Sequence, residues 1–113
     1  MPEPSLRFEN LVASHLLKWV HYEQDTKGRD LELRYFRDTD RREVDFVIVE
    51  GRTPRLFVEC KWRDTEVDRG LRYLNARFPT CPAWQISAVG TKDYVTADGI
   101  RVAPAMRLLP TLV

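Results

Sequence analysis

Three ionisable side chains, Asp45, Glu59 and Lys61, lie inside two apolar segments that a purely structural sheet would fill with neutral residues. The segments, residues 43–50 and 55–61, flank a short Gly/Thr/Pro-containing stretch, which is typical of a β-hairpin. Two neighbouring carboxylates repel each other unless a proton or a cation lies between them, and oxygen ligands of this kind suit a divalent metal ion. The residues therefore predict metal-assisted chemistry, with the lysine acting on a substrate anion or on a water.

The position of the turn predicts which residues of this hairpin face each other. If the turn centres near Arg52, the numbers of paired residues sum to 104, and Asp45 lies opposite Glu59. Directly opposed residues share a face, with Cβ atoms roughly 4.5–5.5 Å apart, and Lys61, two residues beyond Glu59, shares that face too. The alternate residues are expected to point the other way, into a core: Val44, Phe46, Ile48, Val58 and Cys60.

The same three charges also admit a purely structural interpretation. Asp45, Glu59 and Lys61 can form a salt-bridged cluster on a solvent-facing sheet without binding anything. The two interpretations differ in whether the polar atoms converge in an accessible site.

The elements that must position this hairpin are predicted from the spacing of apolar residues. Residues 1–5 are expected to be frayed, with Ser5 as a helix N-cap, and a helix is expected from about Leu6 to Glu23. A strand over 31–37 follows, and then the hairpin. A second helix, capped by Asp64 or Thr65, is expected to end before Pro79.

The remainder of the chain is expected to complete one mixed sheet. A strand over 83–89 comes one helix after the Glu59 strand, which predicts a parallel crossover. Residues 93–104 are expected to form a terminal hairpin, and 106–112 a short helical turn or docking segment. The prediction for the whole chain is a single α/β domain whose elements follow in the order helix, three strands, helix, strand.

Composition limits the function classes. The chain has 113 residues, a formal net charge of +1 and two cysteines, which fits one domain with reduced thiols and no zinc motif. It contains no run of about 20 apolar residues, so neither a membrane partner nor a membrane location is expected, and the expected location is the cytoplasm. DNA binding would need a local basic patch. The second helix shows Arg69, Arg72 and Arg77 on one face, and Arg69 and Arg72 are the candidates for phosphate contact, although a solvated helix face is the favoured interpretation.

The order of the charged motifs resembles the PD-(D/E)xK, or restriction-endonuclease-like, superfamily. The matching positions are Glu9 within Phe8-Glu9-Asn10, Asp45 within Glu43-Val44-Asp45-Phe46, and Glu59-Cys60-Lys61. Residues 8–13, 35–38 and 43–47 are similar, more closely, to the domain of unknown function that follows an AAA+-type ATPase module in many prokaryotic proteins. The resemblance covers roughly residues 6–90 and places Val44 where the superfamily motif has proline.

This resemblance implies a restriction-endonuclease-like αβββαβ core, in which helices flank a mixed central sheet, with a site for Mg²⁺ or Mn²⁺. It implies that Asp45 and Glu59 are metal ligands, that Glu9 is a helix-borne accessory ligand and that Lys61 orients or activates water. The implied activity is hydrolysis of DNA phosphodiesters, and the implied partners are DNA and an AAA+-type ATPase module. The alternative, from a different functional class, is a catalytically inert accessory domain that binds DNA or protein for an ATPase.

Overall fold

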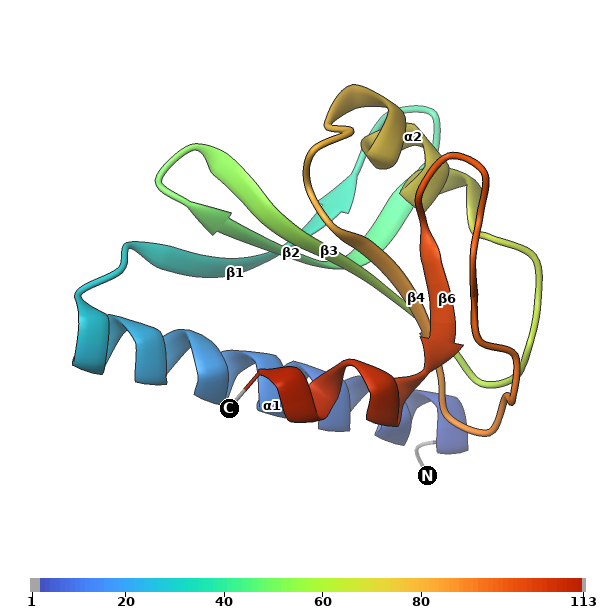
Figure 1. The fold of residues 1–113 in the computed structure, drawn as a ribbon, viewed down its shortest axis with the longest axis horizontal. Helices are drawn as coiled ribbons and strands as arrows, with labels where there is room; N and C mark the ends of the chain where they lie inside the picture. The colour runs from blue at the N-terminus through green and yellow to red at the C-terminus, as the bar shows by residue number, and fades with distance from the viewer. Residues whose placement is uncertain (1–2, 113) are drawn as a thin grey trace.

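The computed structural model describes residues 3–112, which form a sheet with one helix on each face (Figure 1). The elements follow in the order α1 (Pro4–Lys27), β1 (Leu31–Arg37), β2 (Glu43–Glu50), β3 (Thr53–Lys61), α2 (Arg69–Arg77), β4 (Ala83–Ser87), β5 (Tyr94–Val95) and β6 (Arg101–Pro104). Two 3₁₀ turns, Ala105–Arg107 and Leu109–Thr111, end the chain. The predicted α/β class and the αβββαβ order are confirmed.

Helix α1 is longer at both ends than its apolar spacing predicted. It begins at Pro4 with Glu3 as N-cap, so Pro4 and Ser5 are helical and Ser5 is not the cap. The expectation of fraying at Met1 and Pro2 lies outside the described residues. Proline fits the first turn of a helix because its missing N–H would have no partner there. At the other end the helix continues past Glu23 to Gly28, whose φ of 63° provides a left-handed C-cap.

The six strands form one sheet in the order β1-β2-β3-β4-β6-β5. Strands β3 and β4 are parallel, as the crossover through α2 predicted, and β6 adds to β4 in parallel as well. The remaining pairs are antiparallel, including the short terminal hairpin of β5 and β6. The sheet is therefore mixed, and β1 is one of its edges.

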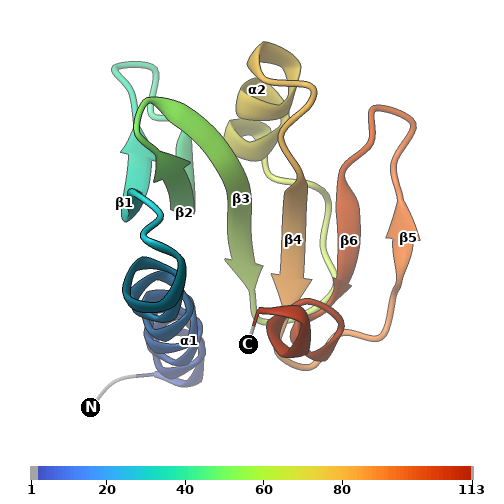
Figure 2. The ribbon, with the colours of Figure 1, turned by 60° about the vertical axis from the view of Figure 1, so that its left-hand side comes forward.

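Each face of the sheet has its own hydrophobic core. The core beneath α1 joins that helix to one face of β2, β3 and β4, and Leu108 and Leu109 of the terminal turns belong to it. Figure 2 shows these turns beside α1, on the same side of the sheet. The other core lies beneath α2 and contains Val44, Val47 and Phe57.

Helix α2 begins later than predicted, and its N-terminus lies close against β2. Its N-cap is Asp68, whose side chain accepts the Gly70 N–H, rather than Asp64 or Thr65. A Cβ atom on Gly70 would lie 2.1 Å from the backbone oxygen of Glu43. The glycine thus permits a backbone approach that any side chain would prevent.

Residues 3–112 contain neither a membrane-spanning helix nor a disulfide between the two cysteines. No helix in this part of the chain has the length and apolar character needed to cross a membrane. Cys60 and Cys81 are both free thiols.

Candidate functional site

The hairpin of β2 and β3 has the predicted register over its central part. Phe46 pairs with Val58 and Ile48 with Leu56, so the numbers sum to 104. Near the turn the register shifts by one residue, and Val49 pairs with Pro54. The regular pairing ends at Phe46, one residue before Asp45 and Glu59 would face each other.

Beyond Phe46, the side-chain carboxylates of Asp45 and Glu59, rather than backbone carbonyl groups, accept the backbone N–H groups of the opposite strand. Glu59 Oε1 accepts the Asp45 backbone N–H at 3.0 Å, and Asp45 Oδ2 accepts the Cys60 backbone N–H at 2.9 Å. Each acidic side chain therefore bonds to the opposite strand. The two strands thus position both carboxylates at the end of the hairpin opposite the turn, where β2 and β3 are no longer paired (the opened end of the hairpin).

A bulge next to Asp45 changes the face of the sheet to which the neighbouring side chains of β2 point. The pairing of β1 with β2 shifts between Arg34 and Phe36, opposite this part of β2. As a result Val44 packs in the core beneath α2, whereas Phe46 packs against the core beneath α1. In a regular strand these two residues would share a face, so the predicted facing of Val44 is wrong. The predicted facing is confirmed for the other four residues, which belong to or pack against the α1 core: Phe46, Ile48, Val58 and Cys60.

Lys61 joins Glu59 to a carboxylate that the sequence did not single out. Its Nζ lies 3.3 Å from Glu59 Oε2 and donates to Asp68 Oδ1 at 3.0 Å. Lys61 and Glu59 therefore share a face, as predicted, and the N-cap of α2 completes their cluster. The polar atoms of these three side chains converge, while Glu59 is only 7% exposed.

Gln85 on β4 fixes the loop that carries Asp68. Its Oε1 accepts the Asp68 N–H at 2.9 Å, and its Nε2 donates to the Glu66 carbonyl at 3.0 Å. The residue is 2% exposed and lies beside Glu59 in the parallel register. Its one signal in the sequence is a polar amide within an otherwise apolar strand segment.

Glu9 lies on the opposite side of Asp45 from this cluster. Glu9 and Asp45 together line two cavities, of about 190 and 370 Å³, between α1 and the β1–β2 pair. Glu59 and Lys61 line neither. In the conformation described for residues 3–112, no three His, Cys, Asp or Glu side chains lie close enough together to enclose a metal ion.

Burial and mutual repulsion raise the proton affinity of the acidic groups. Burial, followed by the charge of Asp45, raises the pKa of Glu59 to about 7. Burial is also the largest cause of the raised pKa of Asp45, and burial together with Asp45 raises the pKa of Glu9. For Lys61, burial acts to lower the pKa, but the bond to Asp68 and the charge of Glu59 outweigh it and raise the value.

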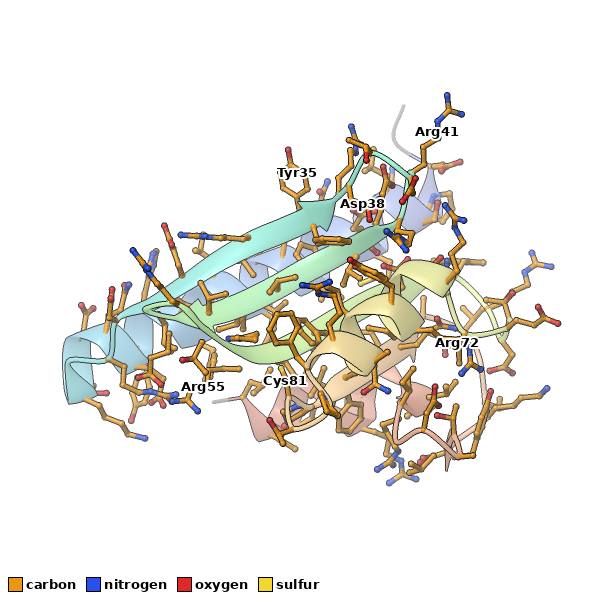
Figure 3. The ribbon with its side chains drawn as sticks, turned by 90° about the horizontal axis from the view of Figure 1, so that it is seen from above. Tyr35, Asp38, Arg41, Arg55, Arg72 and Cys81 are labelled. Atoms are coloured by element: carbon orange, nitrogen blue, oxygen red, sulfur yellow. The ribbon has the colours of Figure 1, made fainter. Side chains whose placement is uncertain are left out.

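The two arginines considered for nucleic-acid contact make contacts within the chain. Arg69 donates to the backbone carbonyl of Asp40, and Arg72 Nη1 donates to Asp98 Oδ2 at 2.9 Å. Arg72 belongs to α2 and is labelled in Figure 3. Both guanidinium groups are thus held in place by acceptors of the chain itself.

Comparison with curated proteins and with solved structures gives no match. A family model does match, over residues 7–108, and its description is "Domain of unknown function (DUF4143)". The matched range includes Glu9, Asp45, Glu59 and Lys61, and it covers nearly the whole sequence. The chain therefore belongs to the DUF4143 family.

Proposed function

We propose that this chain is a nuclease-like domain of the PD-(D/E)xK type that hydrolyses DNA phosphodiesters with the help of Mg²⁺ or Mn²⁺. The observation that carries the proposal is the convergence of the Asp45 and Glu59 carboxylates, each of which accepts a backbone N–H of the opposite strand, next to Lys61. Perturbed carboxylates beside a lysine are typical of catalytic sites. The αβββαβ order of the fold supports the same assignment.

The charge of the site fits a divalent cation. When ionised, the three carboxylates of Asp45, Glu59 and Asp68 outweigh the single ammonium group of Lys61 by two negative charges. Burial makes this excess costly, as the raised pKa values of Asp45 and Glu59 show. A hard cation with oxygen ligands would relieve it.

Each residue has a distinct role in this proposal. Asp45 and Glu59 hold the cation, and Glu9 adds a carboxylate from the α1 side, directly or through a water. A bound cation of this kind polarises a phosphate oxygen and lowers the pKa of a bound water. Lys61 positions the attacking water or balances the charge that develops on the phosphate.

A second candidate function is an inert accessory domain that binds DNA or protein for an AAA+-type ATPase. The observation that favours it is the engagement of Lys61, whose ammonium group is already shared between Glu59 and Asp68. The absence of a three-ligand cluster among residues 3–112 favours it as well. In this case the acidic pair and the lysine serve to stabilise the opened hairpin.

Cleavage of plasmid DNA distinguishes the two functions. The wild-type chain is expected to nick plasmid in the presence of Mg²⁺ or Mn²⁺ but not of EDTA, and Asp45→Asn and Lys61→Ala are expected to abolish nicking. Asp25→Asn and Lys18→Ala, at exposed positions of α1, are matched controls that should retain it. Equal nicking by all five proteins would reject the nuclease proposal; DNA binding by anisotropy without nicking would support the accessory role.

A further inference from the structure

The face of the sheet that carries α2 is only partly covered. Helix α1 has 24 residues and runs beneath the opposite face, whereas α2 has 9. The turn end of the β2–β3 hairpin and the adjoining part of β1 extend beyond α2 (Figures 1 and 3). A sheet face normally buries its apolar side against a second layer, so this uncovered part is open to a partner.

A groove of about 450 Å³ occupies this uncovered part, between β1, β2, β3 and the C-terminal end of α2. Its apolar floor includes Val49, Pro54 and Phe57, and its wall on the helix side includes Phe78, which is 39% exposed. The groove lies away from Glu59 and Lys61, neither of which lines it. Glu9 and Asp45 do not line it either, but Tyr35 and Phe36 also line a cavity that those two residues share, so the groove adjoins the candidate metal site without containing its ligands.

The charge at the groove is of one sign. Three arginines, Arg34, Arg52 and Arg77, line it, and none of the described residues that line it is acidic. Arg34 pairs with Glu32, but within residues 3–112 neither Arg52 nor Arg77 forms a salt bridge. In a chain whose net charge is +1, this is a local concentration of positive charge.

Five aromatic residues line the groove, and three of them are unavailable for stacking on a base: Phe57 is buried, and Phe36 and Tyr73 stack on each other. Single-stranded nucleic acids bind by stacking bases on free aromatic rings. The Tyr73 ring already stacks on Phe36, with centroids 5.9 Å apart, and the Arg42 guanidinium lies 3.6 Å from its centroid. Tyr35 and Phe78 remain exposed. The aliphatic part of the lining suits leucine-like side chains better than bases, which favours a protein occupant; it consists of Val47, Val49, Pro54 and Leu74.

We propose that this groove binds an amphipathic helix of a partner protein, with an apolar stripe against Val49, Pro54 and Phe78 and carboxylates facing the arginines. A helix in this position would extend the layer that α2 begins on this face of the sheet. Arg52 and Arg77 supply the charge complementarity that selects an acidic segment over a basic one. The inference is independent of the proposed nuclease function.

Two synthetic helical peptides of about 15 residues test this binding mode. Both carry the same leucine stripe, flanked by glutamate in one and by lysine in the other. We expect the full chain to bind the glutamate peptide at least about tenfold more tightly than the lysine peptide, measured by fluorescence anisotropy. The double variant Arg52→Glu/Arg77→Glu should lose at least about tenfold in affinity for the glutamate peptide and gain affinity for the lysine peptide.

The control variant makes the same change of charge on the other side of the molecule. Arg7→Glu/Lys18→Glu alters exposed positions of α1 and should leave the affinity for the glutamate peptide within about twofold of wild type. Absence of saturable binding, equal binding of both peptides, or an equal loss in the control would each overturn the proposal. Binding of an oligothymidylate that only the Arg52/Arg77 variant abolishes, without peptide binding, would identify a nucleic-acid groove instead and overturn it too.

Discussion

Asp45 and Glu59 are each bonded to the other's strand: Glu59 Oε1 accepts the Asp45 N–H at 3.0 Å, and Asp45 Oδ2 accepts the Cys60 N–H at 2.9 Å. These bonds replace the backbone pairing of β2 and β3 at the place where it stops. One oxygen of each carboxylate thus accepts a backbone N–H of the opposite strand. A functional group held by the backbone of two strands is positioned more firmly than one on a loop.

The stability of the wild-type chain should fall as pH rises through the titration of Glu59. The ordinary pKa of this carboxyl is 4.5 and the folded value is about 7, so between these values the folded state binds more protons than the unfolded state. The stabilising contribution is complete below about pH 4.5 and is lost as pH rises to about 7, a change of at most about 3 kcal/mol.

Glu59→Gln keeps an acceptor for the Asp45 N–H but cannot ionise. Urea unfolding at several pH values should therefore show this variant becoming more stable, relative to wild type, as pH rises from about 4.5 to about 7.5. Glu66→Gln, at an exposed position of the loop before α2, is the control and should follow wild type. A constant difference between Glu59→Gln and wild type over this range would contradict the raised pKa of Glu59.

Divalent cations should stabilise the chain more at high pH than at low pH. Cations compete with protons for Asp45 and Glu59, whose pKa values are both raised by burial. In a thermal-shift experiment, about 5 mM MnCl₂ should raise Tm more at about pH 8 than at about pH 5.5. Asp45→Asn should remove most of the shift and Asp25→Asn should not; a shift independent of pH and of Asp45 would place the bound cation elsewhere.

Gly70→Ala should be strongly destabilising, because its Cβ would lie 2.1 Å from the Glu43 carbonyl oxygen and 2.7 Å from the Glu43 nitrogen. Both atoms are backbone, so α2 must move away from β2. We expect a loss of about 3 kcal/mol or more in the free energy of unfolding. Gly51→Ala, where a Cβ meets nothing within 4 Å but φ is 61°, should cost about 1 kcal/mol. Similar losses for the two variants would mean that α2 does not approach β2 this closely.

Gln85→Leu should release the loop that holds Asp68 against Lys61. The change leaves the Asp68 N–H and the Glu66 carbonyl without the partners that Gln85 provides. Each group left unpaired in a buried setting costs about 1–3 kcal/mol, which urea unfolding can measure. A loss below about 0.5 kcal/mol would show that water replaces Gln85 at no cost and that the residue does not fix the loop.

The sequence predicts those parts of the fold and site that depend on local periodicity. The turn at residues 51 and 52 and the alternation of the flanking strands determine the central register of the hairpin, which ends at Phe46, so the residues alone place Asp45 and Glu59 on neighbouring strands just beyond that pairing. The position of Lys61 on the same face as Glu59 follows from their spacing of two residues. The parallel crossover to β4 follows from the strand–helix–strand order.

The remaining parts depend on contacts between distant segments. The bulge that turns Val44 toward α2 arises where β1 pairs with β2, and nothing in the residues near Val44 marks it. Asp68 enters the site because Gln85, on another strand, holds its loop. Glu9 reaches Asp45 from the α1 side, so its distance from Glu59 and Lys61 could not be read from the motif order.

In the proposed function, Asp45 and Glu59 together hold a divalent cation. A crystal of the full chain grown with MnCl₂ and a short DNA duplex at about pH 8, where Glu59 is ionised, tests it through the anomalous signal of Mn²⁺. We predict an anomalous peak within about 2.0–2.6 Å of a carboxylate oxygen of each residue, with Lys61 beside the bound phosphate. A structure in which this position holds no anomalous peak, and Lys61 still bridges Glu59 and Asp68, would contradict the claim.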